Sequence, residues 1–169
     1  ILLGNEYKRI SGRINLDQNV SDKLAFGMNL SLTRSQSDRV ANDNAFATPL
    51  QMIALTPLEP THNPETGELN DFTIYENGLI PAKYNSFTQE VYRSLGNLFA
   101  NYSILPGLQF RSEWGVDIYS QREMGYQGRL TNDGGPTGVG SDRTVTMRSL
   151  SANNYFTYDN RFADLFDLN

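Results

Sequence analysis

Residues 108–118, LQFRSEWGVDI, decide the fold of this chain. Their even-numbered side chains are apolar apart from Ser112, and their odd-numbered residues are polar or glycine. A period of two residues is typical of a β-strand with one apolar and one polar face. The Leu-Pro-Gly sequence at 105–107 comes directly before this strand. It predicts a tight turn that joins the strand to its predecessor.

The same alternation extends in both directions along the chain. It predicts further strands at 9–17, 24–33, 92–104 and 144–158, and a truncated strand that begins at Leu165. The fifth strand is less regular, because Asn154 falls among its apolar residues, which favours a β-bulge. In the first four strands the apolar side chains fall mainly at even-numbered positions, with Leu95 and Phe99 as exceptions.

The connections between these strands alternate in length. Short turns are predicted at 18–23, 105–107 and 160–164, and long excursions at 35–90 and 119–143. A short helix is predicted within the first excursion, at 45–55. Short turns that alternate with long loops are typical of outer-membrane barrels, with the short turns periplasmic and the long loops extracellular. Strands of about ten residues also match a tilted crossing of the bilayer.

The fold class predicted from this pattern is all-β. We expect one domain, 1–169, formed by an antiparallel transmembrane β-barrel segment of five strands and the start of a sixth. In the first four strands, even-numbered apolar residues are expected to face lipid and odd-numbered polar residues the lumen. Five strands cannot close a barrel, so the chain is expected to be a piece of a longer protein.

A soluble β-sandwich alternates apolar and polar residues in the same way, because each of its sheets has one buried face. The alternative is therefore a soluble or surface-anchored all-β module that binds carbohydrate or protein through its long loops. The alternation of short and long connections favours the barrel. So do charged residues in the middle of strands, such as Arg111 and Glu113.

Composition excludes several classes of protein. The formal charge is −5 and the 14 Lys and Arg are dispersed, so nucleic acid is not an expected partner. The chain has no Cys, which excludes disulfides and thiolate chemistry. No run of about 20 apolar residues exists to form a membrane-spanning helix. Nor does the chain open with the features of a signal peptide.

No catalytic or metal-binding motif stands out, so we expect no enzyme activity, cofactor or metal. His62 lies in a Pro-rich stretch without a partner at ligand spacing. Asn132-Asp133-Gly134 lacks the rest of a calcium loop, and 134–140 lacks the Lys of a phosphate-binding loop. Glu65 and Glu68 fall in turn sequence. The candidate ligand-binding residues are polar and aromatic side chains of the long loops, chosen to stack on or hydrogen-bond a sugar or peptide: Tyr75, Tyr84, Tyr126, Asn132 and Asp133.

Several short motifs resemble the barrel of SusC/RagA-type TonB-dependent outer-membrane transporters. The first strands carry them at 7–17 (YKRISGRINLD), 20–24 (VSDKL) and 27–31 (GMNLS). The likeness continues in the same order at 93–97 (RSLGN), 102–112 (YSILPGLQFRS) and 156–159 (FTYD). It departs from the family at Phe166, where a His is expected, and no plug domain or TonB box is present.

The resemblance implies a 22-stranded barrel around a plug, located in the bacterial outer membrane. It implies a transporter that imports glycans or peptides with energy transmitted by TonB, and that works with a SusD-like surface lipoprotein. Expected partners are therefore this lipoprotein, TonB through parts outside this chain, an oligosaccharide or peptide substrate, and outer-membrane lipid.

Overall fold

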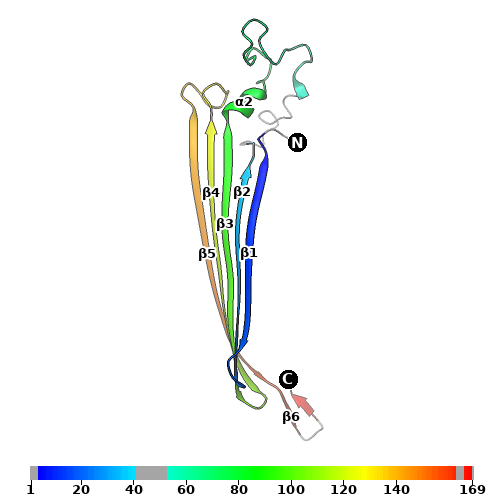
Figure 1. The fold of residues 1–169 in the computed structure, drawn as a ribbon, viewed down its shortest axis with the longest axis vertical. Helices are drawn as coiled ribbons and strands as arrows, with labels where there is room; N and C mark the ends of the chain where they lie inside the picture. The colour runs from blue at the N-terminus through cyan, green and yellow to red at the C-terminus, as the bar shows by residue number, and fades with distance from the viewer. Residues whose placement is uncertain (1–3, 41–52, 163–165, 169) are drawn as a thin grey trace. The chain divides into compact units, whose positions relative to one another are not determined.

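Five long strands form one antiparallel sheet in the order in which they occur in the chain (Figure 1). The computed structural model describes residues 4–40, 53–162 and 166–168. The strands of the sheet are β1 (Glu6–Asn19), β2 (Leu24–Asp38), β3 (Ser86–Leu105), β4 (Leu108–Gln127) and β5 (Val139–Tyr158). The predicted all-β class and the five predicted strands are thus confirmed.

Two smaller elements complete the described structure. The six-residue helix α2 (Leu79–Tyr84) lies between β2 and β3 in the chain. After β5, the strands β6 (Asn160–Phe162) and β7 (Phe166–Leu168) pair antiparallel, with Arg161 opposite Asp167. Residues 160–162 of the turn predicted at 160–164 therefore belong to a strand, and 163–164 lie outside the described residues. The helix predicted at 45–55 falls mostly outside the described residues.

The strands are longer than the alternation predicted. β4 continues to Gln127 and β5 begins at Val139, so only 128–138 connect them instead of 119–143. Similarly, β2 reaches Asp38 and β3 begins at Ser86, so the first connection is 39–85. The added lengths carry polar side chains on both faces, as in Arg122 and Glu123. A strand without an apolar face has no hydrophobic period to reveal it.

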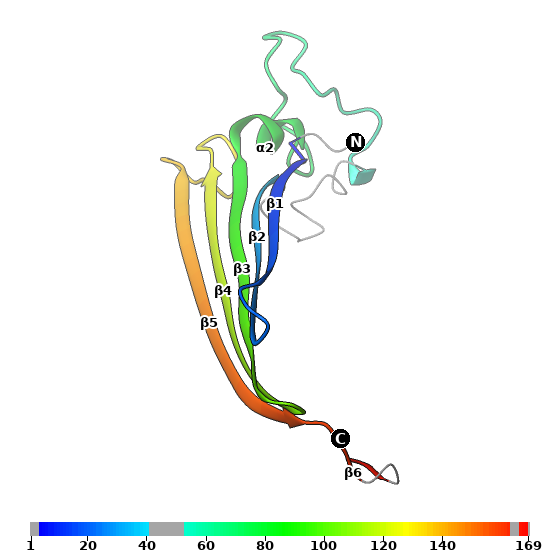
Figure 2. The ribbon, with the colours of Figure 1, turned by 60° about the horizontal axis from the view of Figure 1, so that its bottom comes forward.

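The chain divides into two compact units, each of which includes parts of the five strands. The turn-side unit consists of Ile10–Arg34, Val91–Ser120 and Thr146–Asn169. The loop-side unit consists of Ile1–Arg9, Ser35–Glu90 and Gln121–Val145. In both views of the ribbon, β1 to β5 run side by side in sequence order (Figures 1 and 2).

Contacts within the turn-side unit show that even and odd positions lie on opposite faces of its sheet. A Cβ built on Gly96 would lie 3.0 Å from Val116 Cγ1 and 3.7 Å from Leu30 Cδ1, all from even positions. A Cβ on Gly27 would overlap the Phe99 ring, on the odd side. The predicted register of apolar and polar faces is therefore present across β2, β3 and β4.

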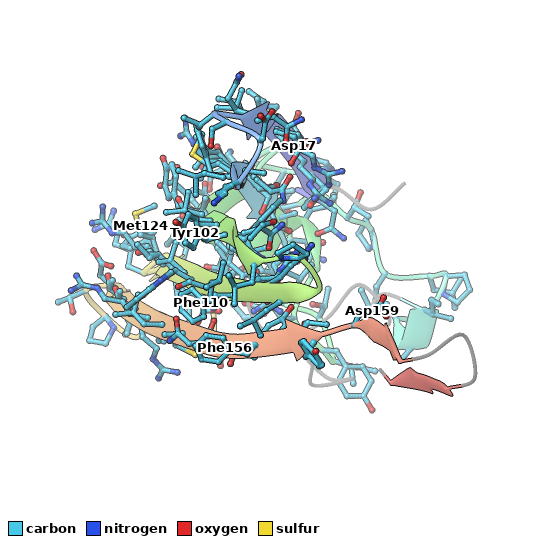
Figure 3. All side chains as sticks on the ribbon, turned by 90° about the horizontal axis from the view of Figure 1, so that it is seen from below. Asp17, Tyr102, Phe110, Met124, Phe156 and Asp159 are labelled. Atoms are coloured by element: carbon cyan, nitrogen blue, oxygen red, sulfur yellow. The ribbon has the colours of Figure 1, made fainter. Side chains whose placement is uncertain are left out.

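Two aromatic side chains of the even face pair near the short turns. Phe110 of β4 and Phe156 of β5 have ring centroids 5.0 Å apart (Figure 3). The turn at 105–107 is also as predicted, because Gly107 adopts a φ of 81°, which glycine accepts without steric cost. Its carbonyl accepts a hydrogen bond of 2.8 Å from Asp159 N–H.

The described residues contain almost no hydrophobic core. Ile80 of α2 is their one buried hydrophobic side chain, at 5% exposure. Large apolar side chains of the turn-side unit remain exposed, for example Ile10 at 75% and Leu150 at 82%. No described helix has the length and apolar character needed to cross a membrane. The apolar face of the sheet thus has no covering layer among the described residues.

Candidate functional site

In the loop-side unit, the connection 39–85 is joined to the connection 128–138 by two hydrogen bonds. Asn85 Oδ1 accepts the Gly128 N–H at 2.9 Å, and Glu76 Oε1 accepts the Asn132 N–H at 2.8 Å. Gly128 approaches Tyr84 closely, since a Cβ at Gly128 would lie 2.7 Å from Tyr84 Cβ. The two connections therefore form one structure instead of two separate loops.

Asn77 stabilises the connection 39–85 through the hydrogen bonds of its buried side chain. Its side chain is 1% exposed, and its Nδ2 donates to the carbonyls of Thr61, at 2.8 Å, and Asn70, at 3.1 Å. Its Oδ1 accepts the Leu79 N–H at 3.2 Å, at the start of α2. All hydrogen-bonding groups of this amide have partners, as a buried polar group requires. Asn77 is thus a structural residue of the site.

A pocket of about 220 Å³ opens where the two connections meet. We call it the loop pocket. Its lining combines polar side chains with three aliphatic ones: Asp71, Thr73, Tyr75, Glu76, Asn77 and Asn132 on the polar side, and Ile74, Ile80 and Leu130 on the aliphatic side. Such a mixture of apolar wall and a few polar groups is typical of ligand sites.

Two of the five predicted ligand residues lie in this pocket. Tyr75 and Asn132 line it from different connections, whereas Tyr84, Tyr126 and Asp133 do not line it. Tyr84 packs against Gly128, and the Tyr126 hydroxyl lies 2.8 Å from the Cβ position of Gly138. Both of these tyrosines therefore support the loops, and Asp133 is exposed outside the pocket.

Sequence reasoning missed the carboxylates of the pocket, Asp71 and Glu76, and the hydroxyl of Thr73. All three lie close to the candidate Tyr75 in the sequence and carry hydrogen-bonding side chains, so their proximity to Tyr75 could have identified them. The bond between Glu76 and the Asn132 backbone, 56 residues apart, is what gathers them. A contact of this kind follows from no local pattern.

The structure places other motifs considered in the sequence in and beside a turn. Asn63 Oδ1 accepts the N–H of Glu65 at 2.8 Å, and Gly67 adopts a φ of 72°, which makes 63–67 a tight turn. His62 Nδ1 lies 3.1 Å from Thr61 Oγ1. Among the described residues, no three His, Cys, Asp or Glu side chains gather to hold a metal ion.

The strand portions of the loop-side unit carry ion pairs and hydrogen bonds on both faces. Arg122 of β4 donates from Nε to both carboxylate oxygens of Asp142 of β5, each at 3.1 Å. This hydrogen bond and the charge of Arg122 hold the pKa of Asp142 below its ordinary value. On the odd face, Arg39 Nη2 lies 3.8 Å from Glu123 Oε1, which also accepts from Gln89.

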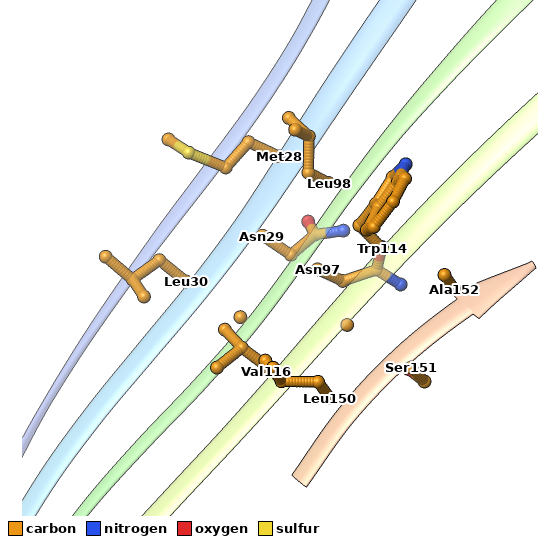
Figure 4. A pocket seen from close by; sticks show the side chains of 12 residues that line it. Met28, Asn29, Leu30, Asn97, Leu98, Trp114, Val116, Leu150, Ser151 and Ala152 are labelled. Carbon is orange, nitrogen blue, oxygen red and sulfur yellow. The ribbon is translucent and has the colours of Figure 1, made fainter. Parts of the chain in front are cut away.

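The turn-side unit has a hollow of a different kind. A groove of about 390 Å³ crosses β2 to β5 on the even face (Figure 4). Its side chains are predominantly apolar and include Met28, Leu30, Leu98, Trp114, Val116, Leu150 and Ala152. Trp114 donates its indole N–H to Ser112 at 2.9 Å, so even this polar atom has a partner.

The odd face of the same unit is polar. Arg93 of β3 makes a two-pronged pair with Asp117 of β4, at 3.1 Å from Nε and 2.7 Å from Nη2. The Arg111 guanidinium pairs with Glu113 and lies 4.5 Å from the ring centroid of Phe99. Ion pairs at this density indicate a face in contact with water or with other polar groups.

Comparison with solved structures shows the fold that this chain resembles. The structure described as the RagAB peptide transporter aligns with a TM-score of 0.73 at 21% identity, over 96% of this chain and 19% of the other. The RagAB peptide importer in the "closed-closed" state aligns with a TM-score of 0.67 at 23% identity, over 94% and 19%. The chain thus has the fold of a segment of these transporters and spans about a fifth of their length.

The other two comparisons found no relatives. No protein-family model matches the sequence, and no curated protein matches it.

Proposed function

We propose that this chain is part of the β-barrel of a SusC/RagA-type, TonB-dependent outer-membrane importer of glycans or peptides. The observation that carries the proposal is the exposed apolar face of the turn-side sheet. Among the described residues one hydrophobic side chain is buried, while even-numbered residues such as Ile10 and Leu150 are largely exposed. A soluble sandwich would cover this face with a second sheet, whereas a barrel covers it with lipid.

The dimensions of this face support a membrane crossing. The apolar even positions of β4 extend from Leu108 to Ile118, which is 11 residues. A strand tilted by about 45° needs about 9–11 residues to cross the hydrocarbon layer. Beyond Ile118, the even positions become Ser120 and Arg122. The hydrocarbon boundary on the loop side is therefore expected between Ile118 and Arg122.

The two open edges of the sheet support a larger barrel. β1 and β5 are the outermost strands, and every described side chain along both is exposed. Long unpaired edges are unstable in lipid and prone to aggregation in water, so we expect further strands of the same barrel to pair with them. The likeness to segments of the RagAB transporters agrees with this expectation.

In this proposal the connections 39–85 and 128–138 face the cell exterior, and the short turns face the periplasm. The loops contact substrate and a SusD-like lipoprotein, and TonB acts through other parts of the transporter. The chain performs no chemistry on the substrate. Its role is to form the wall of the import path and part of its outer opening.

Spin labelling of the full-length transporter in lipid bilayers tests this proposal. Leu30 and Asn29 are neighbours on β2 with opposite faces, and each is replaced by Cys for nitroxide attachment. We expect the label at position 30 to collide with dissolved oxygen as lipid-exposed sites do, and the label at 29 not to. Shielding of position 30 by protein together with lipid contact at 29 would overturn the assignment, and solubility without detergent would favour the binding-module alternative.

A further inference from the structure

We propose that the loop pocket binds the side chain of a lysine or arginine within a peptide substrate. This inference rests on the proposed import function and narrows its substrate class. It is carried by the size of the pocket, by the aliphatic surface that lines part of it, and by the carboxylates that lie beside that surface.

The size of the pocket indicates a subsite for one residue. Its volume of about 220 Å³ falls below the roughly 300–1,000 Å³ that enclose a complete small ligand. A single amino-acid side chain fits this space, and the rest of a peptide then lies outside it.

The aliphatic part of the lining suits the stem of a long cationic side chain. Ile80 is buried and forms part of the lining, while Ile74 and Leu130 are 70% and 56% exposed. Lysine and arginine cover apolar surface with their methylene groups and keep the charged head among polar groups. A short acidic or hydroxylated side chain leaves this surface uncovered.

The polar part of the lining supplies acceptors for the charged head. Asp71 and Glu76 both line the pocket, and neither has a Lys or Arg partner among the described residues. The Asn132 N–H holds Glu76 in place through Oε1, so this carboxylate is oriented before a ligand arrives. Hydrogen bonds from an ammonium or guanidinium group to a carboxylate are stronger than neutral ones. The same two charges repel an anionic side chain.

Calorimetry on the full-length transporter, co-purified with any lipoprotein that remains bound, tests the inference. The probes are three peptides that differ at one position, which holds lysine, norleucine or glutamate. Norleucine keeps the stem and removes the charge. The test variant is the double substitution Asp71→Asn/Glu76→Gln, in which the Gln amide oxygen still accepts the Asn132 N–H. The matched control is Glu65→Gln/Glu68→Gln, which removes two charges from the turn near 63–67 of the same connection.

We expect wild type to prefer the lysine peptide over the norleucine peptide by at least about tenfold. The test variant should lose this preference, and the control should keep it. Equal affinity of wild type for the two peptides, an equal loss for both in the test variant, or no binding of any of the three overturns the inference. The spin-label result at positions 29 and 30 is independent, so a barrel without charge preference would remove only the pocket assignment.

Discussion

The turn-side and loop-side units contain parts of the same five strands but use the even-numbered positions in different ways. In the turn-side unit these positions hold Leu30, Leu98 and Val116 around an apolar groove. In the loop-side unit they hold Arg122 and Asp142 in an ion pair. Backbone hydrogen bonds maintain the strands in both units. The surroundings of each face determine which side chains are suited to it. Under the proposed function, the even face meets lipid in one unit and water in the other.

This comparison predicts its largest effect for a charge placed on the apolar face. If the proposed function holds, Leu98→Arg in the full-length protein should destabilise the barrel by about 2–4 kcal/mol, because an Arg would then lie among acyl chains near the middle of the bilayer. The measurement is the amount of folded, heat-modifiable protein in the outer membrane. We expect a strong reduction.

Two control substitutions sharpen this test. Asn97→Arg places the same charge on the odd face of β3, and Thr144→Arg places it on an exposed even position of the loop-side unit. Both should yield near wild-type amounts. If Thr144→Arg were as harmful as Leu98→Arg, the two units would not differ as we infer.

An intermediate and local effect is expected at Asn77. Replacement by Ala removes both hydrogen bonds that the Asn77 amide donates, to the carbonyls of Thr61 and Asn70, which costs about 1–3 kcal/mol in total. Limited proteolysis should show faster cleavage within 53–85, while the yield of folded barrel stays unchanged. Asn77→Asp keeps the acceptor for Leu79 N–H but loses both donated bonds, so it should behave like Asn77→Ala. If either variant lost the folded barrel, the stability of the loops would not be independent of the stability of the barrel.

The smallest effect is expected for the exposed pair of Arg122 and Asp142. At pH 7, Asp142→Asn should accelerate amide hydrogen exchange at 121–127 and 139–145 by less than about fivefold, since exposed ion pairs contribute little. Arg122 lowers the pKa of Asp142 below its ordinary 3.8, so the contribution is present above that value. It is lost as the pH falls through the lowered pKa, where wild type and variant should exchange alike. A difference that persists there would mean that the pair does not act through charge.

The alternation at 108–118 was sufficient to predict β4, its apolar face and the Gly107 turn. It was insufficient for the stretch from Tyr119 to Gln127, because Arg122 and Glu123 give both faces of the strand to polar side chains. Backbone hydrogen bonds to the neighbouring strands maintain this part of β4, and they leave no periodic trace in the sequence. For this reason the second connection was predicted as 119–143 and is 128–138.

The candidate site was likewise predicted only in part from the sequence. Loop composition alone pointed to Tyr75 and Asn132, because aromatic and amide side chains in long connections are suited to ligand contact. It also pointed to Tyr84, which packs against Gly128 instead. Whether a loop side chain faces a pocket or a neighbouring loop depends on long-range contacts such as the one between Glu76 and Asn132.

The sequence by itself determined that the chain forms antiparallel strands with one apolar and one polar face, because side chains alternate with a period of two. Only the tertiary structure decided where each strand ends and which loop side chains meet. Strand ends in a polar environment depend on pairing with a neighbouring strand, and the loop pocket depends on a bond between residues 56 positions apart. Neither contact is encoded in a local pattern of residues.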